Sequence, residues 1–126
     1  MRLPDGQGEH VELFRGPELR MAVLDRFPEL APGLGPDVGI HAIVSTLGRM
    51  LVSSAHADGF ERVRSITSLL ETLLDRRDLD PEIPNAIAIS FVTPDELRAT
   101  APGKQIWLSM PTRLRRLIEG QLMEIG

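Results

Sequence analysis

The sequence predicts a small all-α protein, and two adjacent segments carry most of that prediction. Residues 58–77 combine a helix-capping residue, a wide apolar stripe at helical spacing and a basic end, which together indicate an amphipathic helix. Residues 84–92 are nearly all apolar, begin with a proline and are closely followed by another. The two segments would supply much of a hydrophobic core, and neither contains a catalytic motif.

Length and composition are those of one globular domain. The chain has 126 residues, of which 42% are hydrophobic and 25% are charged, and its mean hydropathy is −0.04. A domain is roughly 100–200 residues long, and a chain of this size buries about two-thirds of its unfolded surface. We therefore expect a single compact domain that folds without a metal ion or a disulfide.

The absence of cysteine excludes disulfides, zinc sites built on thiolates and a cysteine nucleophile, and it fits a reducing compartment. Residues 1–10 contain no apolar run typical of a secretory signal, and no stretch approaches the ~18 apolar residues that cross a bilayer. The net charge of −4 opposes a nucleic-acid-binding surface. We expect a cytoplasmic protein that binds neither membranes nor nucleic acid.

The chain divides into a loose N-terminal arm, residues 1–16, and a helical domain, residues 17–126. The arm is polar and contains three glycines, and we expect its apolar end, Val11, Leu13 and Phe14, to dock on the domain. The first helix should run from residue 17 to residue 27, because proline fits the first position of a helix and disfavours helical backbone in the residue before it.

Proline and glycine in residues 29–39 predict a loop, and the second helix follows over residues 38–54. In that helix, Ala42, Ser45 and Gly48 form a narrow strip that a neighbouring helix can approach closely. Its apolar stripe consists of Ile40, Ile43, Val44, Leu47 and Leu51.

The third helix should begin after Asp58, which can cap its N–H groups while Glu61 reaches back to the cap. It should end near Arg76 and Arg77, since cations suit the negative end of the helix dipole. Its expected apolar face consists of Phe60, Val63, Ile66, Leu69, Leu70, Leu73 and Leu74.

Residues 83–92 would suit a buried strand as well as a helix by length and β-branched content. A lone strand leaves its backbone groups unpaired, and no second strand is convincing, so we predict a helix. Thr93 and Glu96 then form a capping box that starts a short helix ending before Pro102.

The last helix opens at Pro111, which makes five main helices and one short one. Helix pairs recur about every 40 residues, a spacing that favours stacked hairpins of the HEAT type. The residues expected to share one core are Leu47, Leu51, Ile66, Leu70, Leu73, Ile87 and Phe91.

Several helical motifs of the chain occur together in one known family. They are residues 26–30 (RFPEL), 68–74 (SLLETLL) and 84–92 (PNAIAISFV), with Met110-Pro111 followed by Leu114. In these motifs the chain resembles a small, uncharacterised bacterial all-helical family whose members look like immunity proteins of contact-dependent toxin systems. The resemblance covers about residues 15–120. It implies an all-α fold and no catalytic residues, and it departs at Thr93-Pro94, where family members often carry an acidic residue.

Metal and cofactor sites find little support in the sequence. The acidic residues in segment 75–82 lack the glycine that a calcium loop needs at its sharp turn. His10, His41 and His56 lie far apart and form no ligand pair on one helix. We expect no cofactor, no metal and no catalytic residue.

The first functional hypothesis is a non-catalytic protein-binding module, in the manner of an immunity protein that neutralises a toxin, with a protein partner or a second copy of itself. Charged residues outside the apolar stripe mark its expected surface, at the exit of the third helix: Arg76, Arg77, Asp78, Asp80 and Glu82. Trp107, the only tryptophan, is either a core residue or an anchor of that interface.

The alternative hypothesis is a small-molecule-binding or enzymatic helical domain with a pocket between the second, third and fourth helices. Its polar lining would consist of His41, Ser45, Asn85 and Ser90. A polar cavity converging on His41 or Asn85 would favour this alternative.

Overall fold

The computed structural model describes the backbone of residues 12–57 and 59–125, and the side chains of these residues up to 120. This part of the chain is all-α, as the sequence predicted. It contains seven α-helices, one 3-10 helix and one π-helix, more than the expected five main helices and one short one. In chain order the elements are α1 (Gly16–Arg26), η2 (Pro28–Gly33), α2 (Ile40–His56), α3 (Phe60–Leu74), α4 (Glu82–Ala86), η3 (Ile87–Phe91), α5 (Pro94–Arg98), α6 (Ala101–Ser109) and α7 (Thr112–Ile125).

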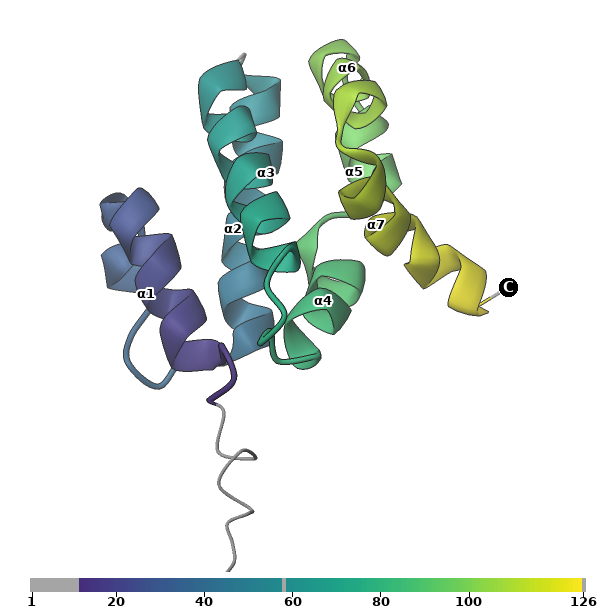
Figure 1. Cartoon of the computed structure of the whole chain (residues 1–126). Coiled ribbons are helices and arrows are strands. Elements are labelled where there is room, and N and C mark those ends of the chain that lie inside the picture. Colours follow the sequence, from purple (N-terminus) through teal and green to yellow (C-terminus); the bar gives the residue numbers. More distant parts are fainter. Residues whose placement is uncertain (1–11, 58, 126) are drawn as a thin grey trace, which may run out of the picture.

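Helix α2 lies at the centre of the arrangement. It pairs with α3 as an antiparallel hairpin, while α1 lies on one side and α5 to α7 lie on the other (Figure 1). α2 also contacts α4 and η3. In a stack of repeats, each repeat contacts only its neighbours. Here α2 contacts elements from both halves of the chain. This arrangement differs from the row of stacked hairpins that the 40-residue spacing of helix pairs suggested.

All seven residues expected to share the core are buried. The core continues through α6 and α7, where Ile106, Trp107, Leu114 and Ile118 are buried as well. Phe60 departs from its predicted place on the buried face of α3, because 40% of it is exposed. It is the first residue of α3 and so lies at the end of the hairpin where α2 connects to α3.

The closest approach between elements brings α2 against the π-helix η3. A Cβ atom on Gly48 would lie 1.7 Å from the carbonyl oxygen of Phe91 and 2.6 Å from its carbonyl carbon. The residue therefore has to be glycine for the two backbones to meet, and the predicted close approach of a helix to this strip is confirmed at Gly48.

The segment predicted to be helical in spite of its β-rich composition is helical. α4 continues directly into η3, and together they cover residues 82–91. The only β-type contact in the described part of the chain is an isolated bridge between Phe14 and Leu79. The prediction of a helix, made because the segment had no convincing strand to pair with, is therefore confirmed.

One segment expected to be a loop is helical, and one further helix was not predicted. Residues 28–33 form η2 and not a loop, because proline suits its first position and bonds such as Leu30 N–H to Phe27 O (3.0 Å) close a 3-10 turn. The short helix expected to end before Pro102 does so, because α5 ends at Arg98, but Pro102 itself lies in the first turn of a further helix, α6, that the sequence did not predict. The side chain of Thr100 caps α6 by accepting a hydrogen bond from Gly103 N–H at 3.1 Å.

The end of the arm that the structure describes is docked, as expected for Phe14. Phe14 is 9% exposed, and its N–H donates to the carbonyl of Asp78 at 2.7 Å. Asp80 N–H donates back to the Phe14 carbonyl at 2.9 Å. The expected docking of Val11 and the expected cap Asp58 lie outside the described residues. None of the described helices is long and apolar enough to span a bilayer.

Candidate functional site

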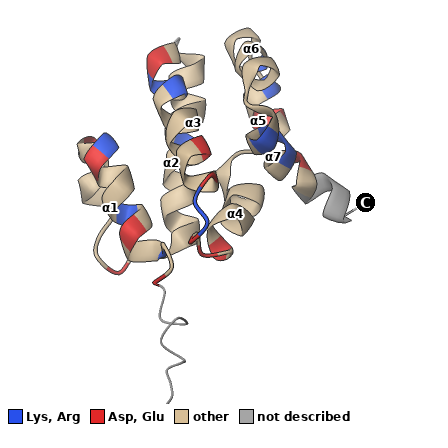
Figure 2. Cartoon of the chain, viewed as in Figure 1, with Lys and Arg blue, Asp and Glu red and all other residues tan. Residues whose placement is uncertain are grey.

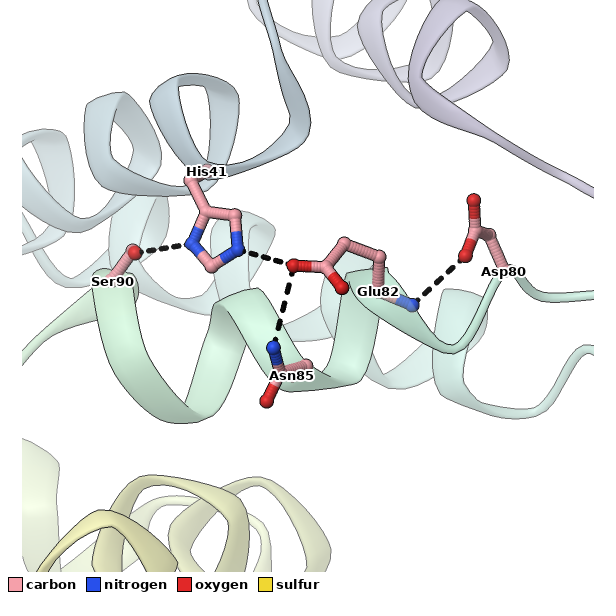
Figure 3. Close-up of polar contacts among 5 residues, drawn as sticks. All are labelled: His41, Asp80, Glu82, Asn85 and Ser90. Carbon is pink, nitrogen blue, oxygen red and sulfur yellow. Dashed lines mark hydrogen bonds and ion pairs between the residues drawn. The ribbon is translucent and has the colours of Figure 1, made fainter.

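Four polar side chains from three elements meet where the first turn of α2 faces α4 and η3. They are His41 on α2, Glu82 and Asn85 on α4, and Ser90 on η3 (Figure 3). The close packing of α2 on η3 at Gly48 brings the two elements near enough for these side chains to meet. We call these four residues the His41 cluster.

His41 is the centre of the cluster and uses both ring nitrogens. Its Nδ1 lies 2.7 Å from Ser90 Oγ, and its Nε2 lies 2.5 Å from Glu82 Oε2. Asn85 Nδ2 donates to the same Glu82 oxygen at 3.3 Å. The imidazole is therefore held from both sides in a fixed orientation.

The cluster is reachable from solvent. The side chains of His41 and Glu82 are 43% and 48% exposed, and Ser90 is partly exposed. The hydrogen bond from His41, followed by that from Asn85, lowers the pKa of Glu82 below its ordinary value of 4.5. Glu82 is thus an ionised hydrogen-bond acceptor at neutral pH.

Three of the four residues expected to line a pocket belong to the cluster. Ser45 does not, because it lies one turn further along α2 and its Oγ accepts a hydrogen bond from Arg49 Nη1 at 3.1 Å. The described groups meet between α2 and the α4–η3 segment, and α3 contributes no residue to the cluster.

Of the residues expected to form an interface, Arg76, Arg77, Asp78 and Asp80 lie on the connector between α3 and α4, where basic and acidic residues follow one another (Figure 2). Arg76 Nε and Nη2 donate to the two carboxylate oxygens of Asp78, each at 2.9 Å. This pairing lowers the pKa of Asp78 below its usual value. The guanidinium also lies over the Phe14 ring at 4.3 Å, so Arg76 and Asp78 hold the arm in place.

The other residues of the expected interface take no part in the pairing of Arg76 with Asp78. The Asp80 carboxylate accepts a hydrogen bond from Glu82 N–H at 2.9 Å and so supports the start of α4. Arg77 is exposed. Glu82 belongs to the His41 cluster, which joins the two sets of candidate residues that the sequence kept apart.

Trp107 lies inside α6 and is only 5% exposed. The guanidinium of Arg98 lies 5.9 Å from the centre of its ring. Of its two expected roles, core packing is the one the structure shows. Trp107 is therefore a core residue and not an anchor of the surface.

The pocket hypothesis already grouped His41 with Ser90, 49 positions away, whereas nothing in the sequence joined His41 to Glu82. His41 and Glu82 are 41 positions apart. Among the side chains that the structure describes, no group of three His, Asp or Glu residues is placed to hold a metal ion. What the cluster offers chemically is hydrogen bonding and proton transfer between a hydroxyl, an imidazole and a carboxylate.

Comparison of the chain with protein-family models, with curated proteins and with solved structures finds no match.

Proposed function

We propose that this protein works by binding another protein at the exposed face of α4 and η3. Glu82, Asn85 and Ile89 follow one another at helical spacing along this segment and are all exposed. Ile89 is 54% exposed, and His41 lies beside the polar members of the face. We call these four residues the α4 face. The observation that supports the proposal is that the exposed, apolar Ile89 lies on the same face as polar side chains that are already hydrogen-bonded to one another.

Two physical properties of the α4 face favour binding. Interfaces commonly have an apolar centre and a polar rim, and here Ile89 would be the centre. Side chains that are ordered before association lose less conformational entropy when a partner arrives. The bonds from His41 and Asn85 to Glu82 supply that order.

The chemistry of the face favours a basic partner. Glu82 and Asp80 place carboxylates at its edge, and the chain carries a net charge of −4. Complementary charge raises the association rate and excludes acidic competitors. We extend the proposal to a cytoplasmic, bacterial, immunity-like protein whose partner is a basic toxin domain, which the resemblance of its helical motifs supports.

Affinity purification from the native host tests the proposal with the full chain as bait. The variant Glu82→Lys/Ile89→Asp alters the α4 face, and Glu119→Lys/Met21→Asp makes the same chemical changes at exposed positions on α7 and α1. We expect wild type and the second variant to retain the same basic protein. The first variant should bind it about tenfold or more weakly, the range for losing interface hot spots.

The outcomes separate the parts of the proposal. Equal binding by both variants, or no retained protein, contradicts binding at the α4 face. A retained protein that is not toxic when expressed alone contradicts the immunity-like role and leaves binding intact. Sedimentation of the purified chain by itself shows whether the partner is a second copy. Circular dichroism of each variant excludes loss of fold as the cause.

A further inference from the structure

We infer that Ser90 is a nucleophile, activated by His41 and Glu82, that accepts the acyl group of a neutral short-chain carboxylic ester. This inference goes beyond the proposed binding function and does not depend on it. Ser90 Oγ lies 2.7 Å from His41 Nδ1, and His41 Nε2 lies 2.5 Å from Glu82 Oε2. A nucleophile within hydrogen-bond reach of a base, and a base oriented by a third group, is the arrangement that activates a hydroxyl.

The proton positions follow from the charge of Glu82. The carboxylate is ionised at neutral pH and can only accept hydrogen bonds. The nitrogen that faces it, His41 Nε2, must therefore carry the proton. In a neutral imidazole the other nitrogen then has a free lone pair, so Nδ1 accepts the hydrogen bond from the Ser90 hydroxyl. Glu82 thus holds His41 in the tautomer that a general base needs.

The surroundings of Ser90 indicate the kind of substrate. Ser90 lies in the π-helix η3, a conformation that is frequent at functional sites. Both Ser90 and His41 are accessible to a small molecule. The neighbouring Ile89 side chain offers apolar contact for a short acyl chain, while the Glu82 carboxylate opposes an anionic substrate.

The proposed reaction is hydrolysis, and it needs only the ester and water as reactants. Ser90 Oγ bonds to the ester carbonyl carbon while its proton passes to His41 Nδ1. The tetrahedral adduct collapses, the ester C–O bond breaks, and the leaving alcohol takes the proton from Nδ1. Water then attacks acyl-Ser90 by the same route, which releases the acid and restores the hydroxyl.

We expect acylation that is easy to detect and turnover that is slow. The His41 cluster provides a nucleophile and a base, and a positioned general base contributes about 10²–10⁴-fold. In efficient hydrolases, hydrogen-bond donors that stabilise the oxyanion raise the rate by a further ~10²–10³-fold. A stoichiometric labelling experiment is therefore the appropriate measurement.

The experiment treats the full chain with a serine-selective alkyl fluorophosphonate and with p-nitrophenyl acetate, and locates adducts by peptide mass spectrometry. We expect one fluorophosphonate adduct per chain, on Ser90. Ser68, an exposed serine of α3, is the matched control, so Ser68→Ala should label like wild type and Ser90→Ala should not label. Mapping of the wild-type adduct does not depend on any variant folding.

Two further variants separate activation from structure. His41→Ala should label about 10²-fold more slowly, the contribution of a general base, and added imidazole should restore part of the rate. Glu82→Gln should slow labelling as well, since Glu82 acts as a positioning residue through His41. Labelling that favours other serines, or that is equally fast in His41→Ala, overturns the inference. Ser90→Ala should keep any partner of the α4 face, so the two proposals fail independently.

Discussion

At the scale of single residues, Gly48 shows how one missing side chain determines the position of two elements. The backbone of η3 occupies the space that any Cβ at this position would need, with the Phe91 carbonyl oxygen 1.7 Å from it. A backbone group cannot move aside as the end of a flexible side chain can. The same contact keeps the first turn of α2 next to η3, where His41 meets Ser90.

We predict that Gly48→Ala destabilises the protein although alanine favours helix. Overpacking a tight contact costs about 1–3 kcal/mol or more, which exceeds the gain of roughly 1 kcal/mol from replacing a helical glycine. Gly120 on α7 has open space around its Cβ position, so Gly120→Ala should keep that gain. Urea unfolding measures both variants, and equal stabilisation of the two would contradict the close contact.

At the scale of elements, caps determine where the short helices after η3 begin. Thr93 and Glu96 form a complete capping box, with Glu96 N–H donating to Thr93 Oγ1 at 3.1 Å and Thr93 N–H donating to Glu96 Oε1 at 2.9 Å. α5 has only five residues, too few for helix propensity alone to hold it. Its order therefore depends on this cap and on the burial of Leu97.

We predict that Thr93→Ala costs about 0.5–2 kcal/mol of unfolding free energy, the range for losing a side-chain cap. Thr72→Ala is the control, because Thr72 is exposed within α3 and alanine is the better helix former there. The control should be neutral or slightly stabilising in the same urea titration. A loss no larger than that of the control would show that the cap does not hold α5.

At the scale of the whole molecule, contacts between distant carboxylates and cations tie the elements together. Arg113 of α7 pairs with Glu71 and Asp75 at the end of α3, at 2.9 and 2.8 Å. The carboxyl groups of Asp78 and Glu29 have lowered pKa values in the fold. Hydrogen bonds lower the pKa of Asp78 through Arg76, and that of Glu29 through a backbone N–H.

We predict that the protein loses stability when the pH falls below about 4.5. A carboxyl group whose pKa is lowered by folding stabilises the folded state when the pH is above the ordinary pKa of the group. That ordinary pKa is 4.5 for Glu29 and 3.8 for Asp78. That stabilisation disappears as the pH falls through the lowered pKa. Urea midpoints from pH 7 to pH 3 measure the effect.

The control for the acid prediction removes the titrating groups. Glu29→Gln/Asp78→Asn should lose less stability than wild type between pH 5 and pH 3, while the single charge removal Asp25→Asn on α1 tests for a general effect of charge. A double variant with the same pH dependence as wild type would contradict a role for these two carboxyl groups.

The sequence predicted the features that depend on residues three or four positions apart. The apolar stripes of α2 and α3, the capping box of α5 and the helical state of residues 82–91 all have this local origin. The sequence analysis missed two helices that begin at or near a proline, because proline both stops a helix and suits its first turn. η2 begins at Pro28 where a loop was expected, and Pro102 lies in the first turn of α6, a helix that was not predicted.

The sequence by itself therefore determined that this protein is helical and which faces of its main helices are buried, since both follow from the periodicity of apolar residues. Only the tertiary structure decided that Trp107 is in the core, that Gly48 meets Phe91 and that Glu82 lies beside His41. The last two contacts join residues more than 40 positions apart, and such pairs are set by how helices pack together. The His41 cluster is consequently a property of the packed molecule and of no single motif.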